Sequence, residues 1–226
     1  MRGTATAALI AAAGSGSRLG RGPKAFVSVR GTTLLDLSLM AFEGAVDEVV
    51  VALPGVAVDD CRVSHPGITV VPGGATRQAS VAAMLEAARA DVVLVHDVAR
   101  PFLTRAVIER VAVAAGTHGA ATAALEVADT VIDVASGTTV ERSNLRLVQT
   151  PQGFDRVLLM EAHAAARRSG ETATDDADLV RRLGHRVELV QGSRLLHKLT
   201  GPDDLSLAEG LYDRWVDERR REAGRG

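Results

Sequence analysis

The amino-acid sequence predicts an α/β fold: a doubly wound, mostly parallel sheet from which a β-hairpin arm protrudes. Apolar strand-like runs alternate with helix-like segments over most of the 226 residues, and short glycine-rich turns join them. The first of these runs leads directly into a glycine loop, and in parallel sheets ligands bind beyond the carboxyl ends of the strands. The alternation fails in one region, 129–153, which predicts the arm.

In the first half of the chain, apolar spacing separates strands from helices. The small-apolar run 6–13 ends at a glycine and is typical of a buried parallel strand. Apolar residues recur at helical spacing from Leu34 to Ala41, which predicts a helix over 33–45. We expect further strands at 48–53, 68–71, 92–96 and 120–127, and further helices at 76–90 and 104–115.

The second half begins with the segment that interrupts the pattern. Two β-branched stretches flank a Ser136-Gly137 turn without a helix between them, so we expect the hairpin arm at about 129–153. The alternation then resumes. We expect a helix from 155, a helix at 175–183, a strand at 186–190 and a final helix after Pro202.

Length and composition narrow the class of protein. The chain is about one and a half times the usual domain length, so we expect a single domain over 1–226 with the arm as an embellishment. A formal net charge of −2 argues against binding nucleic acid by bulk charge, and the single cysteine excludes a disulfide framework. No apolar run reaches the roughly 18 residues of a membrane span, and no signal peptide is evident. We therefore expect a cytoplasmic protein with neither membrane nor nucleic acid as partner.

Two of the 26 basic residues are lysines, Lys24 and Lys198, and the others are arginines. A lysine is a compact point charge, whereas an arginine is a planar fork, so the two positions that remain lysine are candidates for function. Lys198 lies in an apolar stretch, which we read as the end of a buried strand. There an ammonium group needs an anionic partner, either a substrate phosphate or a neighbouring carboxylate such as Asp203 or Asp204.

The glycine loop after the first strand indicates an anion site. Glycines at this place let backbone N–H groups approach a phosphate. The third glycine comes too late for a dinucleotide fingerprint, no acidic residue ends the second strand, and the phosphate-loop motif is absent, which disfavours a dinucleotide oxidoreductase. Two cations, Arg18 and Lys24, accompany the loop residues Ala12, Ala13, Gly14 and Gly16.

Two later strand ends also carry polar residues. Gly73-Gly74 precedes a predicted helix start with Arg77 and Ser80, an arrangement that favours anions. Asp97 ends a buried strand and suits ribose or sugar hydroxyls, or a place near magnesium; Arg100 suits bidentate pairing with phosphate. His96 is read as a structural histidine, and the six histidines lack metal-ligand spacing.

Ordered motifs across nearly the whole chain resemble those of the sugar-phosphate nucleotidylyltransferases. Among these the chain is most similar to the 2-C-methyl-D-erythritol 4-phosphate cytidylyltransferases of the non-mevalonate isoprenoid pathway. The matching stretches are Ala12-Ala13-Gly14-x-Gly16-x-Arg18, Pro23-Lys24, Gly73-Gly74-x-x-Arg77-x-x-Ser80, Val95-His96-Asp97-x-Ala99-Arg100-Pro101, Asp129-Thr130, Gln149-Thr150-Pro151-Gln152-Gly153-Phe154, Thr174-Asp175-Asp176-Ala177 and Lys198-x-Thr200-x-Pro202-x-Asp204.

The resemblance implies a Rossmann-like nucleotidylyltransferase that moves CMP from CTP to 2-C-methyl-D-erythritol 4-phosphate and releases pyrophosphate. It also implies Mg²⁺ held mainly by the CTP phosphates, with no protein ligands assigned, and a homodimer formed through the arm. The sugar phosphate is already an anion, so the chemistry requires stabilisation of charge rather than a base or a protein nucleophile.

The resemblance also assigns roles to individual residues. Catalysis is assigned to Arg18, Lys24, Arg142 and Lys198. Nucleotide binding is assigned to Ala12, Ala13, Gly14, Gly16, Gly73, Gly74, Arg77, Ser80 and Asp97. The sugar-phosphate site is assigned to Asp97, Arg100, Thr130, Arg142, Thr150, Thr174 and Lys198.

Two alternatives stay open. A cytidylyltransferase for another polyol phosphate, such as ribitol 5-phosphate, would share most of these motifs, and a nucleotide-binding module could keep the fold without turnover. Three residues depart from the family pattern: Ala75, Val98 and His197. Every version with turnover requires the ammonium groups of Lys24 and Lys198 to share one cavity.

Overall fold

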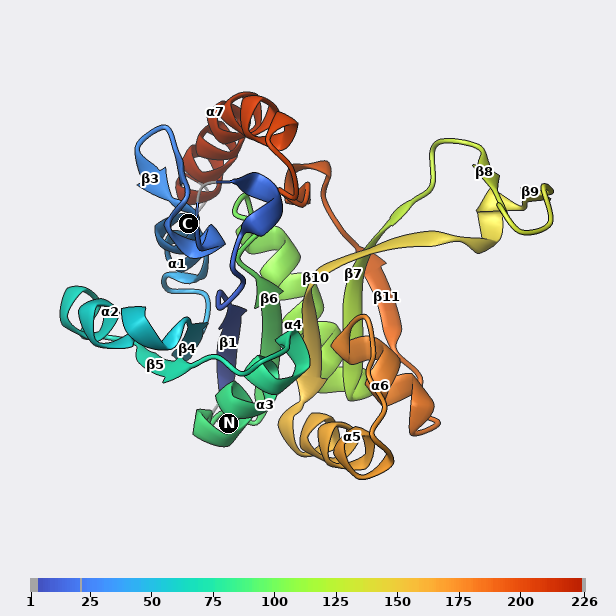
Figure 1. Ribbon diagram of the computed structural model, residues 1–226, viewed down its shortest axis with the longest axis horizontal. Helices are drawn as coiled ribbons and strands as arrows, with labels where there is room; N and C mark the ends of the chain where they lie inside the picture. The colour runs from blue at the N-terminus through green and yellow to red at the C-terminus, as the bar shows by residue number, and fades with distance from the viewer. Residues whose placement is uncertain (1–3, 21, 225–226) are drawn as a thin grey trace.

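The computed structural model describes residues 4–20 and 22–224, and its centre is a seven-stranded sheet with the order β11-β7-β10-β6-β1-β4-β5 (Figure 1). β10 is antiparallel to both of its neighbours, and all the other strand pairs of this sheet are parallel. The expected fold class is therefore present. The strands are β1 (Thr6–Ala11), β4 (Glu48–Leu53), β5 (Thr69–Pro72), β6 (Val92–Asp97), β7 (Ala120–Glu126), β10 (Arg146–Asp155) and β11 (Glu188–Gln191).

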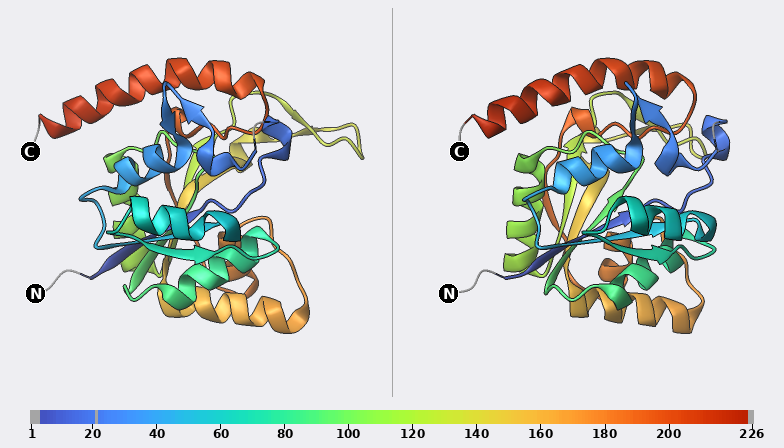
Figure 2. Two further views of the ribbon diagram at one scale, coloured as in Figure 1. Left: turned by 60° about the vertical axis from the view of Figure 1, so that its left-hand side comes forward. Right: turned by 90° about the vertical axis from the view of Figure 1, so that its left-hand side faces the viewer.

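Helices cover both faces of this sheet. α1, α2, α4 and α7 belong to one apolar layer, and α3, α5 and α6 to the other. In Figure 2 the C-terminal helix α7 and helix α5 lie on opposite sides of the strands. The helices are α1 (Leu34–Phe42), α2 (Val58–Ser64), α3 (Arg77–Ala87), α4 (Arg105–His118), α5 (Arg156–Ser169), α6 (Asp176–Arg182) and α7 (Asp203–Ala223).

Small residues in the central strands allow this close layering. Ala8 and Ile10 of β1 face one layer and Ala7 and Leu9 face the other, and all four are fully buried. α7 is anchored by Trp215, which is also fully buried and donates its indole N–H to the Leu103 carbonyl at 2.7 Å. None of the helices in the described part of the chain has the length and apolar run needed to cross a bilayer.

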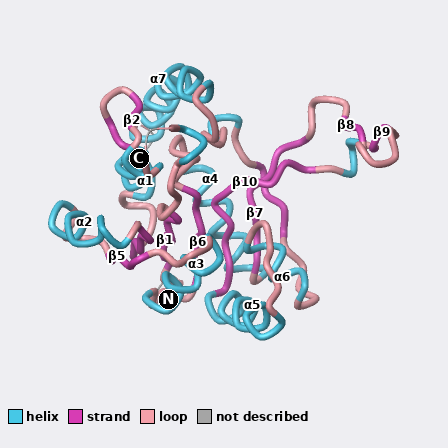
Figure 3. The backbone as a smooth tube through the Cα atoms, in the orientation of Figure 1, coloured by secondary structure: helices cyan, strands magenta, loops and turns pink. Residues whose placement is uncertain are grey.

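The hairpin arm is shorter than the sequence predicts. Its two-stranded tip pairs β8 (Val131–Ile132) with β9 (Thr139–Val140), and Figure 3 shows that loop makes up most of the rest. The end of the predicted range, 149–153, belongs instead to β10 and is buried between β6 and β7. The amides of its two buried glutamines are hydrogen-bonded internally: Gln149 to Ser193, and Gln152 to the start of α6.

Short elements complete the part of the fold that positions the site. β2 (Ser28–Val29) pairs with β3 (Thr32–Thr33) next to α7. Single turns of 3₁₀-helix occur at Ser17–Leu19, Lys24–Phe26, Gly55–Ala57, Arg142–Asn144 and Arg194–Leu196. The first two of these turns follow β1, and the last one precedes Lys198.

Candidate active site

A cavity of about 450 Å³ lies at the carboxyl ends of β1 and β6. These strands are neighbours, and in their register Ala11 pairs with Asp97, so the loops that follow them meet at one edge of the sheet. The cavity has the size of a small-molecule site. Its described lining is Ala11, Ala13, Gly14, Ser15, Gly16, Ser17, Arg18, Lys24, Gly74, Ala75, Thr76, Arg77, Ser80, Asp97, Val98, Ala99 and Lys198.

Glycine is required at two turns beside the cavity. Gly16 has a φ of +67°, and a Cβ there would overlap the Gly22 carbonyl oxygen. This turn brings the Lys24 N–H to the Gly14 carbonyl at 3.2 Å, and so brings Lys24 back to the end of β1. A Cβ at Gly73 would overlap the Ala13 side chain, because the two loops pack directly against each other.

The start of α3 forms the opposite wall. Thr76 caps this helix by accepting the Ala79 N–H at 3.0 Å. Ser80 Oγ accepts the Gly74 N–H at 3.1 Å and donates to the Thr76 carbonyl at 3.0 Å. The hydroxyl that was predicted to bind nucleotide therefore stabilises the turn between Gly74 and α3. The N-terminal end of a helix carries partial positive charge, which favours an anion in the cavity.

Four cations line this cavity: Arg18, Lys24, Arg77 and Lys198. Lys24 Nζ donates to the Leu199 carbonyl at 2.8 Å, and Lys198 Nζ contacts Asp97 Oδ2 at 2.7 Å. Burial, followed by repulsion from Lys198 and Arg18, lowers the pKa of Lys24. The two ammonium groups therefore share one cavity. Lys198 follows a 3₁₀ turn rather than ending a strand, and its partner is Asp97 rather than Asp203 or Asp204.

Asp97 is held by cations on two sides. Arg77 Nε contacts its Oδ1 at 2.8 Å, while Lys198 contacts its Oδ2. Burial alone would raise the pKa of Asp97, but Arg77 and Lys198 together hold it well below its usual range. The carboxylate is therefore ionised at neutral pH.

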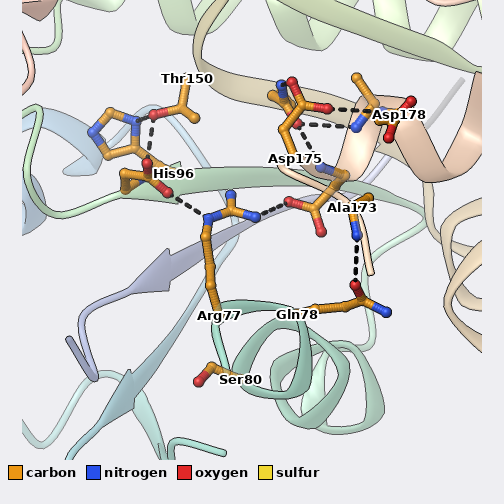
Figure 4. A network of polar contacts seen from close by, with 12 residues as sticks. Arg77, Gln78, Ser80, His96, Thr150, Ala173, Asp175 and Asp178 are labelled. Carbon is orange, nitrogen blue, oxygen red and sulfur yellow. Dashed lines mark hydrogen bonds and ion pairs between the residues drawn. The ribbon is translucent and has the colours of Figure 1, made fainter. Parts of the chain in front are cut away.

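Arg77 belongs to a longer network of polar contacts (Figure 4). Its Nη1 contacts Asp176 Oδ2 at 2.7 Å, and Asp176 Oδ1 accepts from His163 Nε2 at 3.0 Å. Asp176 and His163 are both buried, and Arg77 contacts the carboxylates of both Asp97 and Asp176. Desolvation opposes the charge on Asp176, but the His163 hydrogen bond and Arg77 lower the pKa of this carboxyl.

His96 and Thr150 are buried behind Asp97. Thr150 Oγ accepts the Asp97 N–H at 3.1 Å and lies 3.1 Å from His96 Nδ1. The Arg100 carbonyl can only accept, so His96 Nε2 donates to it at 3.1 Å, and Nδ1 of the neutral ring accepts the Thr150 hydroxyl proton. His96 is therefore a neutral structural histidine, as expected, and Thr150 braces the backbone of Asp97 without lining the cavity.

The structure does not bring every predicted site residue to the cavity. Arg100 does not line it: Nη1 donates to the Leu196 carbonyl at 2.7 Å and Nη2 to the Val148 carbonyl at 3.4 Å. Thr174 is exposed just before α6, and Ala12 and Gly73 lie behind the lining residues. Thr130 and Arg142 are exposed on the arm, where Arg142 Nη1 donates to the Ala128 carbonyl.

Some structural partners of the site were not assigned from sequence. Asp176 lies in a recognised motif, Thr174-Asp175-Asp176-Ala177, but only the threonine was given a role. His163 lies in none of the recognised motifs. Its link to the site is its contact with Asp176, which the sequence does not show. In the described part of the chain no three His, Cys, Asp or Glu side chains gather as a metal site.

The family model of 2-C-methyl-D-erythritol 4-phosphate cytidylyltransferase matches residues 6–214. The chain belongs to this family. A 2-C-methyl-D-erythritol 4-phosphate cytidylyltransferase of Thermus thermophilus is 54% identical over 210 residues, covering 92% of this chain and 97% of that one. The protein of the same name from Deinococcus radiodurans is 53% identical over 209 residues, covering 91% and 89%.

Solved structures agree with this membership. The crystal structure of a Thermus thermophilus cytidylyltransferase of this name superimposes with a TM-score of 0.81 and 49% sequence identity, covering 92% of this chain and 98% of that chain. Another, titled 4-diphosphocytidyl-2C-methyl-D-erythritol synthase, has a TM-score of 0.79 and 33% identity, covering 94% and 100%. The family and fold class expected from the motifs are both confirmed.

The three departures from the cytidylyltransferase pattern have different places. Ala75 lines the cavity with backbone and a methyl group, and Val98 is a buried part of the same wall. His197 lies outside the lining and donates from Nε2 to Asp204 Oδ1 at 2.8 Å.

Buried His96 makes stability depend on pH. Burial lowers its pKa to about 4, against about 6.5 in an unfolded chain. Between these values the unfolded state binds the extra proton, so the free energy of unfolding falls as pH decreases from about 6.5 to 4, by up to about 1.4 kcal/mol per pH unit from this group. Denaturant unfolding over this range measures the slope.

His96→Gln removes this group, so we expect a shallower slope than in the wild type. The exposed His118→Gln is the matched control and should keep the wild-type slope. Equal slopes for His96→Gln and the wild type would contradict the assignment of His96 as buried and neutral.

Proposed function

We propose that this chain transfers CMP from CTP to 2-C-methyl-D-erythritol 4-phosphate and releases pyrophosphate, as a nucleotidyltransferase of non-mevalonate isoprenoid biosynthesis. The observation that carries this proposal is the convergence of Arg18, Lys24 and Lys198 on one cavity beside a glycine loop. The family names a cytidylyltransferase acting on this sugar phosphate, and the cavity supplies the charge that such a transfer needs.

Triphosphate binding would offset an electrostatic cost within the cavity. Lys24 is partly desolvated and lies near two other cations, which is why its pKa is lowered. A triphosphate brings negative charge to the same place and so favours the protonated ammonium. The attraction increases further as negative charge builds on the α-phosphoryl oxygens in the transition state, which is the condition for catalysis.

The cavity contributes charge and position rather than a base or a nucleophile. An oxygen of the sugar phosphate forms a bond to the α-phosphorus of CTP, and the bond from that phosphorus to the β-phosphate oxygen breaks. The attacking oxygen is already an anion. Among the described lining residues Asp97 is the only acid, and it is ionised and bound by two cations, so it acts through charge and hydrogen bonding.

Magnesium fits this cavity as a companion of the nucleotide. Asp97 has both oxygens committed to Arg77 and Lys198, and the described residues form no cluster of metal ligands. The phosphates of CTP would therefore supply most of the ligands, with Asp97 nearby. When bound, Mg²⁺ would neutralise charge on the triphosphate and orient it.

The arm is proposed to complete a neighbouring subunit in a homodimer. It extends beyond β7 and β10, on the side of the sheet away from α1 and α2 (Figure 1), and it exposes Ile132 and Val134. Thr130 and Arg142 do not line the cavity of their own chain. Delivered to a partner's cavity, they would hold the sugar phosphate for attack.

CTP is a cytoplasmic metabolite, and we place the reaction in the cytoplasm on that ground.

Turnover is tested by pyrophosphate release with CTP, Mg²⁺ and either 2-C-methyl-D-erythritol 4-phosphate or ribitol 5-phosphate. We expect activity with the former and much less with the latter. Lys24→Ala should lower kcat by about 100-fold or more, because it removes a cation from the transition state. Arg105→Ala, which removes an exposed cation on α4, is the control and should keep wild-type kcat. Preference for ribitol 5-phosphate, or no pyrophosphate release, would reject the proposal.

Subunit mixing tests the arm. Arg142→Ala and Lys24→Ala are each expected to be nearly inactive, but a mixed dimer would combine one intact arm with one intact cavity. Mixing should restore up to about a quarter of wild-type activity, since half of randomly mixed dimers are mixed and each has one working site. Lys24→Ala mixed with Lys198→Ala should restore none. An absence of recovery in verified mixed Arg142→Ala dimers would assign the arm to its own subunit.

A further inference from the structure

The segment 197–201 positions both lysines of the chain. It carries Lys198 itself, and its Leu199 carbonyl accepts the hydrogen bond from Lys24 Nζ at 2.8 Å. The segment is neither helix nor strand: a 3₁₀ turn ends at Leu196 and α7 begins at Asp203. Its shape therefore depends on contacts with other elements rather than on a helix or sheet ladder.

The N-terminal part of this segment is held from the end of β6. The Leu199 N–H donates to the Ala99 carbonyl at 2.8 Å, and Arg100 Nη1 donates to the Leu196 carbonyl at 2.7 Å. These contacts fix the backbone up to Leu199. They leave Thr200 and Gly201, which lead into α7, to be held by something else.

One carboxylate holds that second part. Asp204 Oδ2 accepts from the Thr200 N–H at 2.7 Å, the Thr200 hydroxyl at 2.9 Å and the Gly201 N–H at 2.8 Å. Its Oδ1 accepts from His197 Nε2 at 2.8 Å. These donors, chiefly Gly201 N–H, lower the pKa of Asp204 well below its usual range, so the group is ionised when it makes these bonds.

Asp204 is itself fixed to the core. It lies in the first turn of α7, and α7 is anchored through Trp215, whose ring packs against Phe102 and whose N–H donates to the Leu103 carbonyl. Phe102 and Leu103 follow β6 closely, as does Ala99. The segment is thus held at two places, by Ala99 directly and by Asp204 through α7. Both attachments connect it to residues that follow β6, the strand that ends with Asp97.

We propose that Asp204 is a positioning residue for phosphoryl transfer: it holds segment 197–201 so that the Lys198 ammonium faces Asp97 and the Leu199 carbonyl receives Lys24. Asp204 does not line the cavity, so it acts through Thr200, Gly201 and His197 rather than on substrate. The kinetic part of this inference rests on the proposed function. The placement of the two ammonium groups does not.

Asp203 provides a matched control. It occupies the same first turn of α7 and carries the same charge, but it is exposed, and the hydrogen bonds that hold the segment go to Asp204 instead. Asp203→Asn and Asp204→Asn both remove one negative charge from the helix N-terminus. A difference between them therefore isolates the contacts to the segment from the general effect on α7.

The two lysines make the placement directly observable. With only Lys24 and Lys198 in the sequence, protein labelled with ¹³C,¹⁵N-lysine gives two side-chain signals, which Lys24→Arg assigns. We expect Asp204→Asn to shift both signals, since the backbone that carries Lys198 and the carbonyl that receives Lys24 both move. Asp203→Asn should leave both unchanged. Unchanged lysine signals in folded Asp204→Asn would overturn the proposal, whether or not the chain turns over CTP.

Kinetics supply the second readout. For Asp204→Asn we expect kcat to fall by about 10-fold or more with a smaller change in the KM for CTP, because ammonium placement matters most in the transition state. Asp203→Asn should stay near wild type. Thr200→Val, which removes one hydroxyl donor and keeps the N–H, should have a smaller effect in the same direction and serves if Asp204→Asn fails to fold. A wild-type kcat in folded Asp204→Asn would contradict the positioning role of Asp204. If Asp204→Asn cannot be purified, wild-type lysine signals and a wild-type kcat in Thr200→Val would contradict it.

Discussion

A buried carboxylate between two cations is the constraint on which this cavity depends. Asp97 ends β6 with little exposure to solvent, and an unpaired charge there would be costly. Arg77 and Lys198 compensate it from opposite directions, and Thr150 fixes its backbone from behind. Asp97 binds the Lys198 ammonium group, which therefore lies in the same cavity as Lys24. The cavity carries more positive than negative side chains, which favours an anionic ligand.

The fold makes this arrangement through adjacency rather than through a contiguous motif. β1 and β6 are neighbours in the sheet, so the glycine loop after β1 and the end of β6 open onto the same space. The start of α3 adds Arg77, and the segment before α7 adds Lys198. Charged groups from distant parts of the sequence thus surround one cavity, and Lys24, Arg77 and Lys198 are each fixed by backbone or by a buried partner.

Much of this could be predicted from sequence, because strands, helices and glycine loops leave local patterns. The parallel core, the glycine loop and the shared cavity of the two lysines could all be predicted. Side-chain direction was not: Arg100 and Thr150 belong to motifs but face the backbone behind the cavity. The Asp176–His163 pair left no local signal either and required the three-dimensional structure. Asp204 stands in a motif with Thr200, but the motif did not show that its carboxylate accepts hydrogen bonds from the segment that precedes it. The predicted arm likewise included 149–153, which the structure places in the central strand β10.

The most direct measurement of the central claim is a crystal structure of the chain with CTP and Mg²⁺. The triphosphate should lie in the cavity between the glycine loop and α3, with the ammonium groups of Lys24 and Lys198 and the guanidinium of Arg18 turned toward its oxygens. A nucleotide bound at another surface, or one in this cavity whose phosphates point away from both lysines, would contradict the account.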